Sequence, residues 1–158
     1  MADFLKTTNI SLYTLPLAWL LCITPRMYSM RLFTSSTGRS MDTTLPRGLA
    51  DRARTEGAAL TAATRARILR AEAAQANGCE NVGYFAAAVV AGNFAGVGKG
   101  WLNGLSLGYL VSRVVYNWAY IKSEGPRMAM ARTVVFFVGQ GMIWTFFVMA
   151  GNRLRRAG

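Results

Sequence analysis

The stretch at residues 106–121, SLGYLVSRVVYNWAYI, is apolar enough to lie inside a membrane, yet it carries Arg113 near its middle. A charge at the centre of a bilayer costs roughly 2.5–3.5 kcal/mol even on the most lenient insertion scale. A membrane helix that keeps such a residue turns it toward protein or toward a polar cavity. The stretch therefore predicts a helical membrane protein with a polar feature in its interior.

Apolar runs of this kind recur along the chain and alternate with basic segments. Hydrophobic residues make up 53% of the 158 residues, while the formal net charge is +11. A soluble basic domain seldom combines these properties, whereas a small protein that crosses a membrane several times does. The arginines cluster at the ends of apolar runs and not along one soluble face, so we expect no nucleic-acid partner.

The chain has only two cysteines, Cys22 and Cys79, and it has no histidine. Both cysteines lie in or beside apolar runs. This pattern indicates neither a disulfide framework nor a zinc site, so we expect no bound metal.

Four apolar segments approach the ~20 residues that a helix needs to cross the hydrocarbon core of a bilayer. They lie roughly at residues 11–33, 77–97, 101–121 and 133–150. The first is the weakest, because Pro16, Pro25 and Arg26 interrupt it. Backbone groups in lipid must be hydrogen-bonded internally, which favours helices. The prediction is an all-α fold in which residues 1–158 form a single domain, an integral membrane four-helix bundle.

A polar extension at residues 34–76 separates the first two spans. It begins with TSSTGRSMDTT and Pro46, which predict a loop on the cytosolic side. From Leu49 onward the composition is rich in alanine and arginine, both strong helix formers. We expect a helix that starts there and runs straight into the second span. The short link around Lys99 predicts an antiparallel hairpin of the second and third spans.

Basic residues are distributed unevenly between the two ends of these spans. Of the 18 lysines and arginines, eleven flank or occupy the 1–2 and 3–4 loops, and five lie on the other side. The positive-inside rule places both loops in the cytosol and both termini across the membrane. Two targeting interpretations compete with this topology: a signal peptide at residues 1–30 and a mitochondrial targeting segment within residues 26–70.

Polar residues inside the spans mark a candidate site. On the third span, Tyr109, Arg113, Tyr116 and Tyr120 are spaced by 4, 3 and 4 residues, so they share one helical face. Glu80 lies on a polar face of the neighbouring second span. Two interpretations follow for Glu80 and Arg113: a buried ion pair that holds the helices together, or a polar cleft for a charged small molecule.

These residues resemble a known family, the membrane-associated proteins in eicosanoid and glutathione metabolism (MAPEG). The run RAEAAQANGCENVGYF and the later SRVVYNWAY carry the resemblance, which covers roughly residues 12–155. The Asn-x-x-Glu hallmark of the family matches Asn77 and Glu80. Its R-x-x-[HY]-x-x-x-Y pattern matches Arg113, Tyr116 and Tyr120, and its fourth helix opens with Arg-Ser, here Arg132-Thr133.

The resemblance implies a homotrimer of four-helix subunits that binds glutathione between subunits, near the cytosolic surface. It implies that Arg132 is catalytic and holds the glutathione thiolate. The residues that it implies for glutathione binding are Arg39, Arg70, Gln75, Asn77, Glu80, Arg113, Tyr116 and Tyr120. The thiolate would attack a lipophilic electrophile that enters from the bilayer. We therefore expect a glutathione transferase or peroxidase in the endoplasmic reticulum, with a mitochondrial membrane as the alternative.

The sequence departs from the family pattern at three positions, Ala73, Phe136 and Gly48, which leaves open whether catalysis is retained. An insertion before the fourth span makes Arg127 a rival for Arg132. For the arginine of the first helix, Arg39 is preferred over Arg31. Two other functions stay open: a non-catalytic relative that binds lipid or scaffolds partners, and an unrelated small structural membrane subunit.

Overall fold

The computed structural model describes residues 2–55 and 59–157, and all of its regular elements are helices. The expected all-α class is confirmed for this part of the chain. In chain order the elements are α1 (Ala2–Thr7), η1 (Ser11–Tyr13), α2 (Thr14–Thr37), α3 (Leu49–Thr55), α4 (Ala62–Phe94), α5 (Lys99–Lys122) and α6 (Pro126–Ala157). The four long helices α2, α4, α5 and α6 correspond to the four expected apolar segments.

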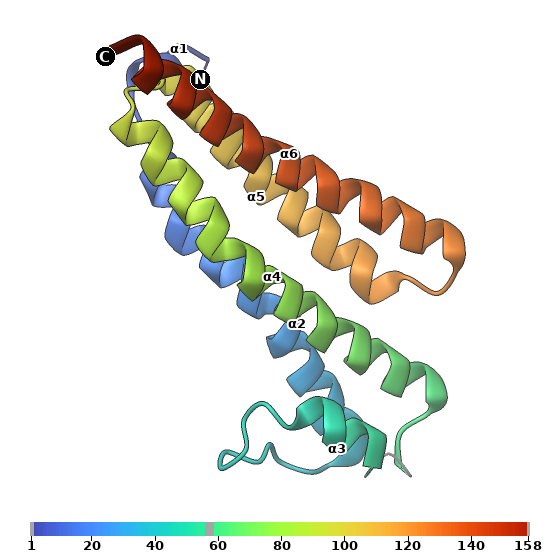
Figure 1. Cartoon of the computed structure of the whole chain (residues 1–158). Helices are drawn as coiled ribbons and strands as arrows, with labels where there is room; N and C mark the ends of the chain where they lie inside the picture. Colours follow the sequence, from blue (N-terminus) through green and yellow to red (C-terminus); the bar gives the residue numbers. More distant parts are fainter. Residues whose placement is uncertain (1, 56–58, 158) are drawn as a thin grey trace.

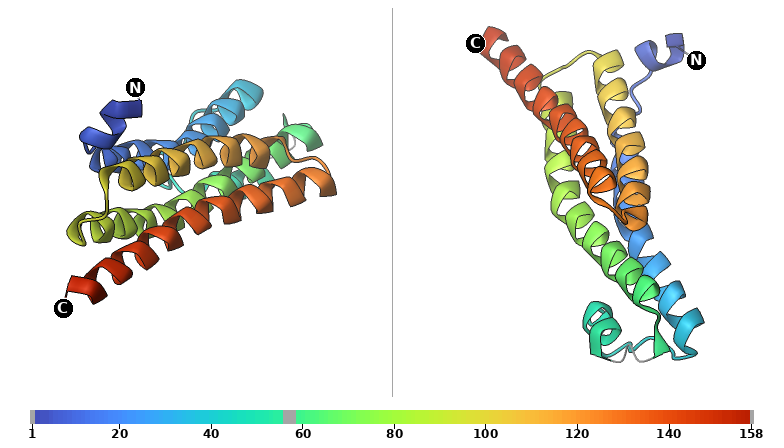
Figure 2. Two further views of the ribbon diagram at one scale, coloured as in Figure 1. Left: turned by 90° about the horizontal axis from the view of Figure 1, so that it is seen from above. Right: turned by 90° about the vertical axis from the view of Figure 1, so that its right-hand side faces the viewer.

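The long helices pack as two pairs, α2 with α4 and α5 with α6 (Figure 1). Contacts of α4 with α5 and α6, and of α2 with α5, join the two pairs. The pairs lie together near the chain termini and diverge toward the opposite end, where α3 lies against the α2–α4 pair (Figure 2). Both termini are at the same end of the molecule (Figure 1).

The first long helix is not interrupted where its sequence suggested. Helix α2 continues through Pro25, which is buried inside it. It ends at Thr37 and is capped by Gly38, whose left-handed φ of 69° favours glycine and whose amide donates to the carbonyl of Thr34 at 2.9 Å. The first apolar segment is therefore one helix four residues longer than expected at its carboxyl end.

The expectation of a single helix from Leu49 into the second span is wrong. Helix α3 ends at Thr55, and α4 begins at Ala62. The hydroxyl of Thr61 accepts a hydrogen bond from the amide of Thr64 at 3.1 Å. This N-cap satisfies a backbone donor of the first turn and so favours a new helix start here. Helix α3 then packs on α2 and α4 in a small apolar cluster of Phe33, Leu49, Ala53, Leu60 and Ile68.

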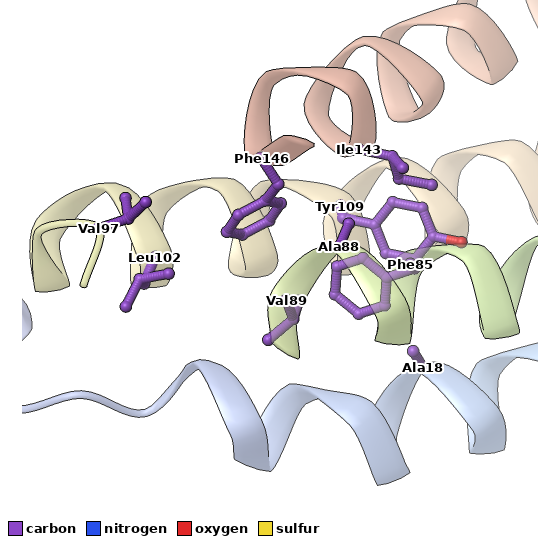
Figure 3. Close-up of a cluster of buried hydrophobic side chains, with 9 residues drawn as sticks. All are labelled: Ala18, Phe85, Ala88, Val89, Val97, Leu102, Tyr109, Ile143 and Phe146. Atoms are coloured by element: carbon purple, nitrogen blue, oxygen red, sulfur yellow. The ribbon is translucent and has the colours of Figure 1, made fainter. Parts of the chain in front are cut away.

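The main core lies where α2, α4, α5 and α6 meet (Figure 3). The rings of Phe85 and Tyr109 stack at its centre, with centroids 3.9 Å apart. Ile143 and Phe146 of α6 pack from one side, and Ala18 of α2 from the other (Figure 3). The remaining members of this cluster are Ala88, Val89, Val97 and Leu102.

The outer surface is apolar as well. All four tryptophans, Trp19, Trp101, Trp118 and Trp144, are at least half-exposed. Such a surface suits a lipid environment better than water. Among the described helices, only α6 is long and apolar enough to cross a membrane by length and composition.

Candidate functional site

A polar pocket of about 210 Å³ lies among α4, α5 and α6, close to the α5–α6 connection. Its lining residues come from all three helices. Four of them are predicted site residues, Asn77, Tyr116, Tyr120 and Arg132, and the other two are Thr133 and Phe136. Tyr116 and Tyr120 are four residues apart and therefore project from one face of α5. The first turns of α6 face them because α5 and α6 are an antiparallel pair.

Asn77 fixes one side of this pocket. Its side-chain amide donates a hydrogen bond to the Tyr116 hydroxyl at 3.1 Å and so joins α4 to α5. The rings of Tyr116 and Tyr120 meet edge to face, with centroids 5.4 Å apart. The two phenols are therefore held side by side at the pocket wall.

Arg132 provides the positive charge of the pocket. Its guanidinium carbon lies 4.1 Å from the centroid of the Tyr120 ring, which is cation–π geometry. The side chain is half-buried, and within the described part of the chain it forms no ion pair. Its N–H groups are thus available to an anion in the pocket.

Arg113 lies beneath the same pocket and is only 4% exposed. Its guanidinium carbon is 5.1 Å from the ring centroid of Tyr109, 4.9 Å from that of Tyr116 and 5.6 Å from that of Phe136. One nitrogen, Nη2, donates to the Phe136 carbonyl at 3.3 Å, whereas Nη1 is buried without a hydrogen-bond partner. Among the described residues, aromatic faces surround this charge and no acid pairs with it.

Of the two interpretations for Glu80 and Arg113, an ion pair within one chain is wrong. Glu80 is exposed, and among the described residues it forms no ion pair with Arg113. The reason is helical periodicity: the next residue, Asn81, is buried and accepts a hydrogen bond from Gln140. A residue adjacent in sequence is rotated by about 100° around the helix axis, which turns Glu80 outward.

The other predicted ligands also lie outside the pocket. Arg70 is beside it: its Nε donates to the carbonyl of Ile121 at 3.0 Å, at the end of α5. Gln75 donates to the Cys79 sulfur at 3.1 Å. Arg39 is exposed just beyond the end of α2.

The structure distinguishes between the rival arginines by position. Arg132 lines the pocket, whereas Arg127 is exposed and is not among the lining residues. Neither Arg39 nor Arg31 reaches the pocket; Arg31 lines a separate hollow beside Met30 and Met41.

One ion pair, largely buried, was not predicted from the sequence. Arg26, which interrupts the first apolar run, pairs with Glu72 of α4 at 2.9 Å, and their side chains are only 17% and 10% exposed. The Ser29 hydroxyl also donates to Glu72. A charge inside an apolar run calls for a buried partner, and that was the available signal.

The fold and the site together define a class: an all-helical protein with an apolar exterior, a buried arginine and a polar pocket near one end of its helices. Comparison with protein families gives a match to the MAPEG family over residues 11–152. The chain belongs to the MAPEG family and is a membrane protein. This confirms the resemblance and excludes an unrelated membrane subunit. Comparisons with curated proteins and with solved structures gave no significant match.

Proposed function

We propose that the protein is a membrane-bound glutathione transferase or peroxidase that acts on lipophilic electrophiles. The observation that carries this proposal is the pocket in which Arg132, Tyr116 and Tyr120 converge. Glutathione has two carboxylates, amide groups and a thiol. Phenol and guanidinium N–H and O–H groups are the donors that such anions and amides need.

Arg132 is proposed to hold the thiolate. A free thiol has a pKa of about 8.5, and bringing it near 7 requires roughly 2 kcal/mol. One guanidinium in a partly dry cleft can supply that energy. The thiolate sulfur then attacks an electrophilic carbon and expels the leaving group. With a peroxide, two glutathione molecules are oxidised to the disulfide while the peroxide becomes an alcohol and water.

A single chain offers only part of a glutathione site. The pocket of about 210 Å³ is smaller than the ~300–1,000 Å³ of typical ligand sites. Gln75, Glu80 and Arg39 point elsewhere within the chain. These facts support the proposal of a homotrimer, in which the outward Glu80 of one subunit meets glutathione beside the pocket of the next.

The membrane arrangement is proposed to include α2, α4 and α5 as well as α6, so that the chain crosses four times. The half-exposed tryptophans support lipid contact around the molecule. Both termini share one end, as an even number of crossings requires (Figure 1). The eleven-to-five distribution of basic residues favours a cytosolic α5–α6 connection. The endoplasmic reticulum is the proposed location, and a mitochondrial membrane is the alternative.

The test is glutathione titration of the detergent-purified protein, with thiolate formation followed by its ultraviolet absorbance at neutral pH. Wild-type protein is expected to bind glutathione and to show the thiolate signal. Arg132→Gln should retain binding within about tenfold but lose the signal, because a neutral amide cannot hold the sulfur anion. Arg127→Gln is the matched control, since it removes an exposed arginine outside the pocket. No glutathione binding by the wild type would refute the proposal.

A second candidate function is lipid binding without catalysis. An apolar groove of about 390 Å³ runs between α5 and α6 and is lined by Gly108, Val111, Ser112, Val115, Val135, Val138 and Met142. Phe136, where family enzymes have a tyrosine, also makes the pocket less polar. Co-purified lipid together with an absence of glutathione binding would favour this function.

A further inference from the structure

The two cysteines of the chain form a close pair between α2 and α4. The sulfur atoms of Cys22 and Cys79 are 2.8 Å apart, and both are free thiols. Cys22 is buried, whereas Cys79 is exposed. A pair of thiols in contact, one of them exposed at the surface of the chain close to Asn77 of the polar pocket, can be oxidised to a disulfide without access to the inner sulfur.

The backbones of the two helices are close at this point because of Gly78. A Cβ atom at Gly78 would lie 3.2 Å from both Cα and Cβ of Cys22, tighter than nearly all ordinary contacts. A disulfide requires a sulfur–sulfur distance of about 2.05 Å. Only a small approach from the present separation is therefore needed, and the helices already hold the cysteines in position.

The surroundings of Cys79 favour it as the attacking sulfur. The side-chain amide of Gln75 donates a hydrogen bond to this sulfur at 3.1 Å. The thiolate is the nucleophile in disulfide exchange, and of the two sulfurs only that of the exposed Cys79 can be reached by a small disulfide. Cys22, in contrast, is buried and lines a very small cavity together with Gly78, Tyr109 and Arg113.

We propose that Cys22 and Cys79 are a reversible dithiol–disulfide site that reacts with small disulfides of the glutathione disulfide type. Cys79 loses its proton, and its sulfur attacks one sulfur of the small disulfide, which releases one thiolate. Cys22 then loses its proton and attacks the Cys79 sulfur, which releases the second thiolate. The two cysteines give up two electrons, which reduce the small disulfide to two thiols, and the two protons go to the leaving thiolates.

The new bond would fix α2 to α4 next to the polar pocket. Cys79 is two residues from Asn77, whose amide holds the Tyr116 hydroxyl. Disulfides exposed to a reducing thiol pool are transient and follow the redox poise of that pool. This inference goes beyond the proposed transferase activity, because neither cysteine lines the polar pocket.

The experiment equilibrates the full-length, detergent-purified protein with mixtures of glutathione and glutathione disulfide. Acid quenching, alkylation of the remaining thiols and intact-mass measurement then report the state of both cysteines. With increasing glutathione disulfide, wild-type protein is expected to lose both alkylatable thiols together and to gain no glutathione adduct. Dithiothreitol should restore both thiols.

Two single variants separate the roles of the sulfurs. Cys22→Ser should accumulate a glutathione mixed disulfide on Cys79, because no second thiol is present to displace it. Cys79→Ser should gain no adduct, because Cys22 is buried. Adducts on wild-type protein, disulfides between chains, or an adduct on Cys79→Ser would overturn the proposal. So would two thiols that stay alkylatable in pure glutathione disulfide.

Arg132→Gln distinguishes this inference from the proposed transferase function. It removes the charge proposed to hold the glutathione thiolate but leaves both cysteines and Gln75 unchanged. We expect the variant to form the internal disulfide over the same range of redox ratios as the wild type. A shift of that range by more than about tenfold in the ratio would contradict a separate site.

Discussion

The guanidinium of Arg132 lies over the ring of Tyr120, with its central carbon 4.1 Å from the ring centroid. The two residues come from different helices, α6 and α5, and both line the polar pocket. Within the described part of the chain Arg132 forms no ion pair, so its charge is balanced only by this aromatic contact. The contact therefore positions a positive charge for a ligand without neutralising it.

Replacing the Tyr120 ring should weaken the function of Arg132. Tyr120→Leu removes the cation–π contact, which contributes about 0.5–2 kcal/mol. We expect kcat/KM for glutathione to fall about 2- to 30-fold. Tyr120→Phe keeps the aromatic face and is the matched control, expected to lose less than the leucine variant. Equal losses in the two variants would show that the hydroxyl matters and that the ring face does not.

Arg113→Met should separate stability from binding. The arginine is 4% exposed and has no acidic partner in the described structure, so methionine removes a desolvated charge without stranding another. We expect the free energy of unfolding to stay unchanged or to rise by about 1 kcal/mol. Glutathione affinity should fall at least tenfold, because Arg113 supports Tyr116 and Phe136 at the pocket. Unfolding in detergent and calorimetric titration measure the two effects. A loss of several kcal/mol in stability with normal binding would contradict this prediction.

Breaking the buried pair of Arg26 and Glu72 should be costly. Arg26→Leu leaves the Glu72 carboxylate, which is only 10% exposed, without its cation. We expect a loss of about 3–5 kcal/mol in the free energy of unfolding, and substantial recovery when Glu72→Leu is added.

The exposed pair Arg54–Asp51 is the control for this experiment, since its side chains are 60% and 79% exposed. Arg54→Leu should change stability by less than about 1 kcal/mol. Denaturant unfolding of the wild type and these three variants, followed by circular dichroism, compares their stabilities. If Arg26→Leu were no more destabilising than Arg54→Leu, the buried pair would not hold α2 to α4.

Two glycines of α6 should respond oppositely to alanine. A Cβ atom at Gly139 would collide with the Arg113 guanidinium and approach the Ser112 hydroxyl to 2.9 Å, whereas one at Gly141 meets nothing within 4 Å. We expect Gly139→Ala to destabilise by about 1–3 kcal/mol and to weaken glutathione binding. Gly141→Ala should be neutral or stabilising by up to about 1 kcal/mol, because alanine favours the helix. Similar unfolding midpoints for the two variants would refute a tight contact at Gly139.

Much of the fold follows from local pattern in the sequence. Apolar segments of near-membrane length predicted the four long helices, and the spacing of Arg113 and Tyr116 correctly placed both on a buried face of α5. These features depend on helical periodicity and hydrophobicity, which neighbouring residues determine among themselves. The break between α3 and α4 also has a local cause, the Thr61 cap, but strong helix-forming composition on both sides concealed it.

The pairing of charges was decided only by the tertiary structure. Opposite charges on neighbouring helices suggested that Glu80 pairs with Arg113. Instead, Arg113 lies among aromatic rings, and the acid that forms an ion pair across α2 and α4 is Glu72, with Arg26. Partner choice depends on the rotation and axial offset of each helix, which packing of the whole core determines. The same applies to Cys22 and Cys79, which are 57 residues apart in sequence and meet because Gly78 lets α2 and α4 approach. Sequence thus determined which residues are polar, charged or reactive within the helices, and the packing of those helices determined which of them meet.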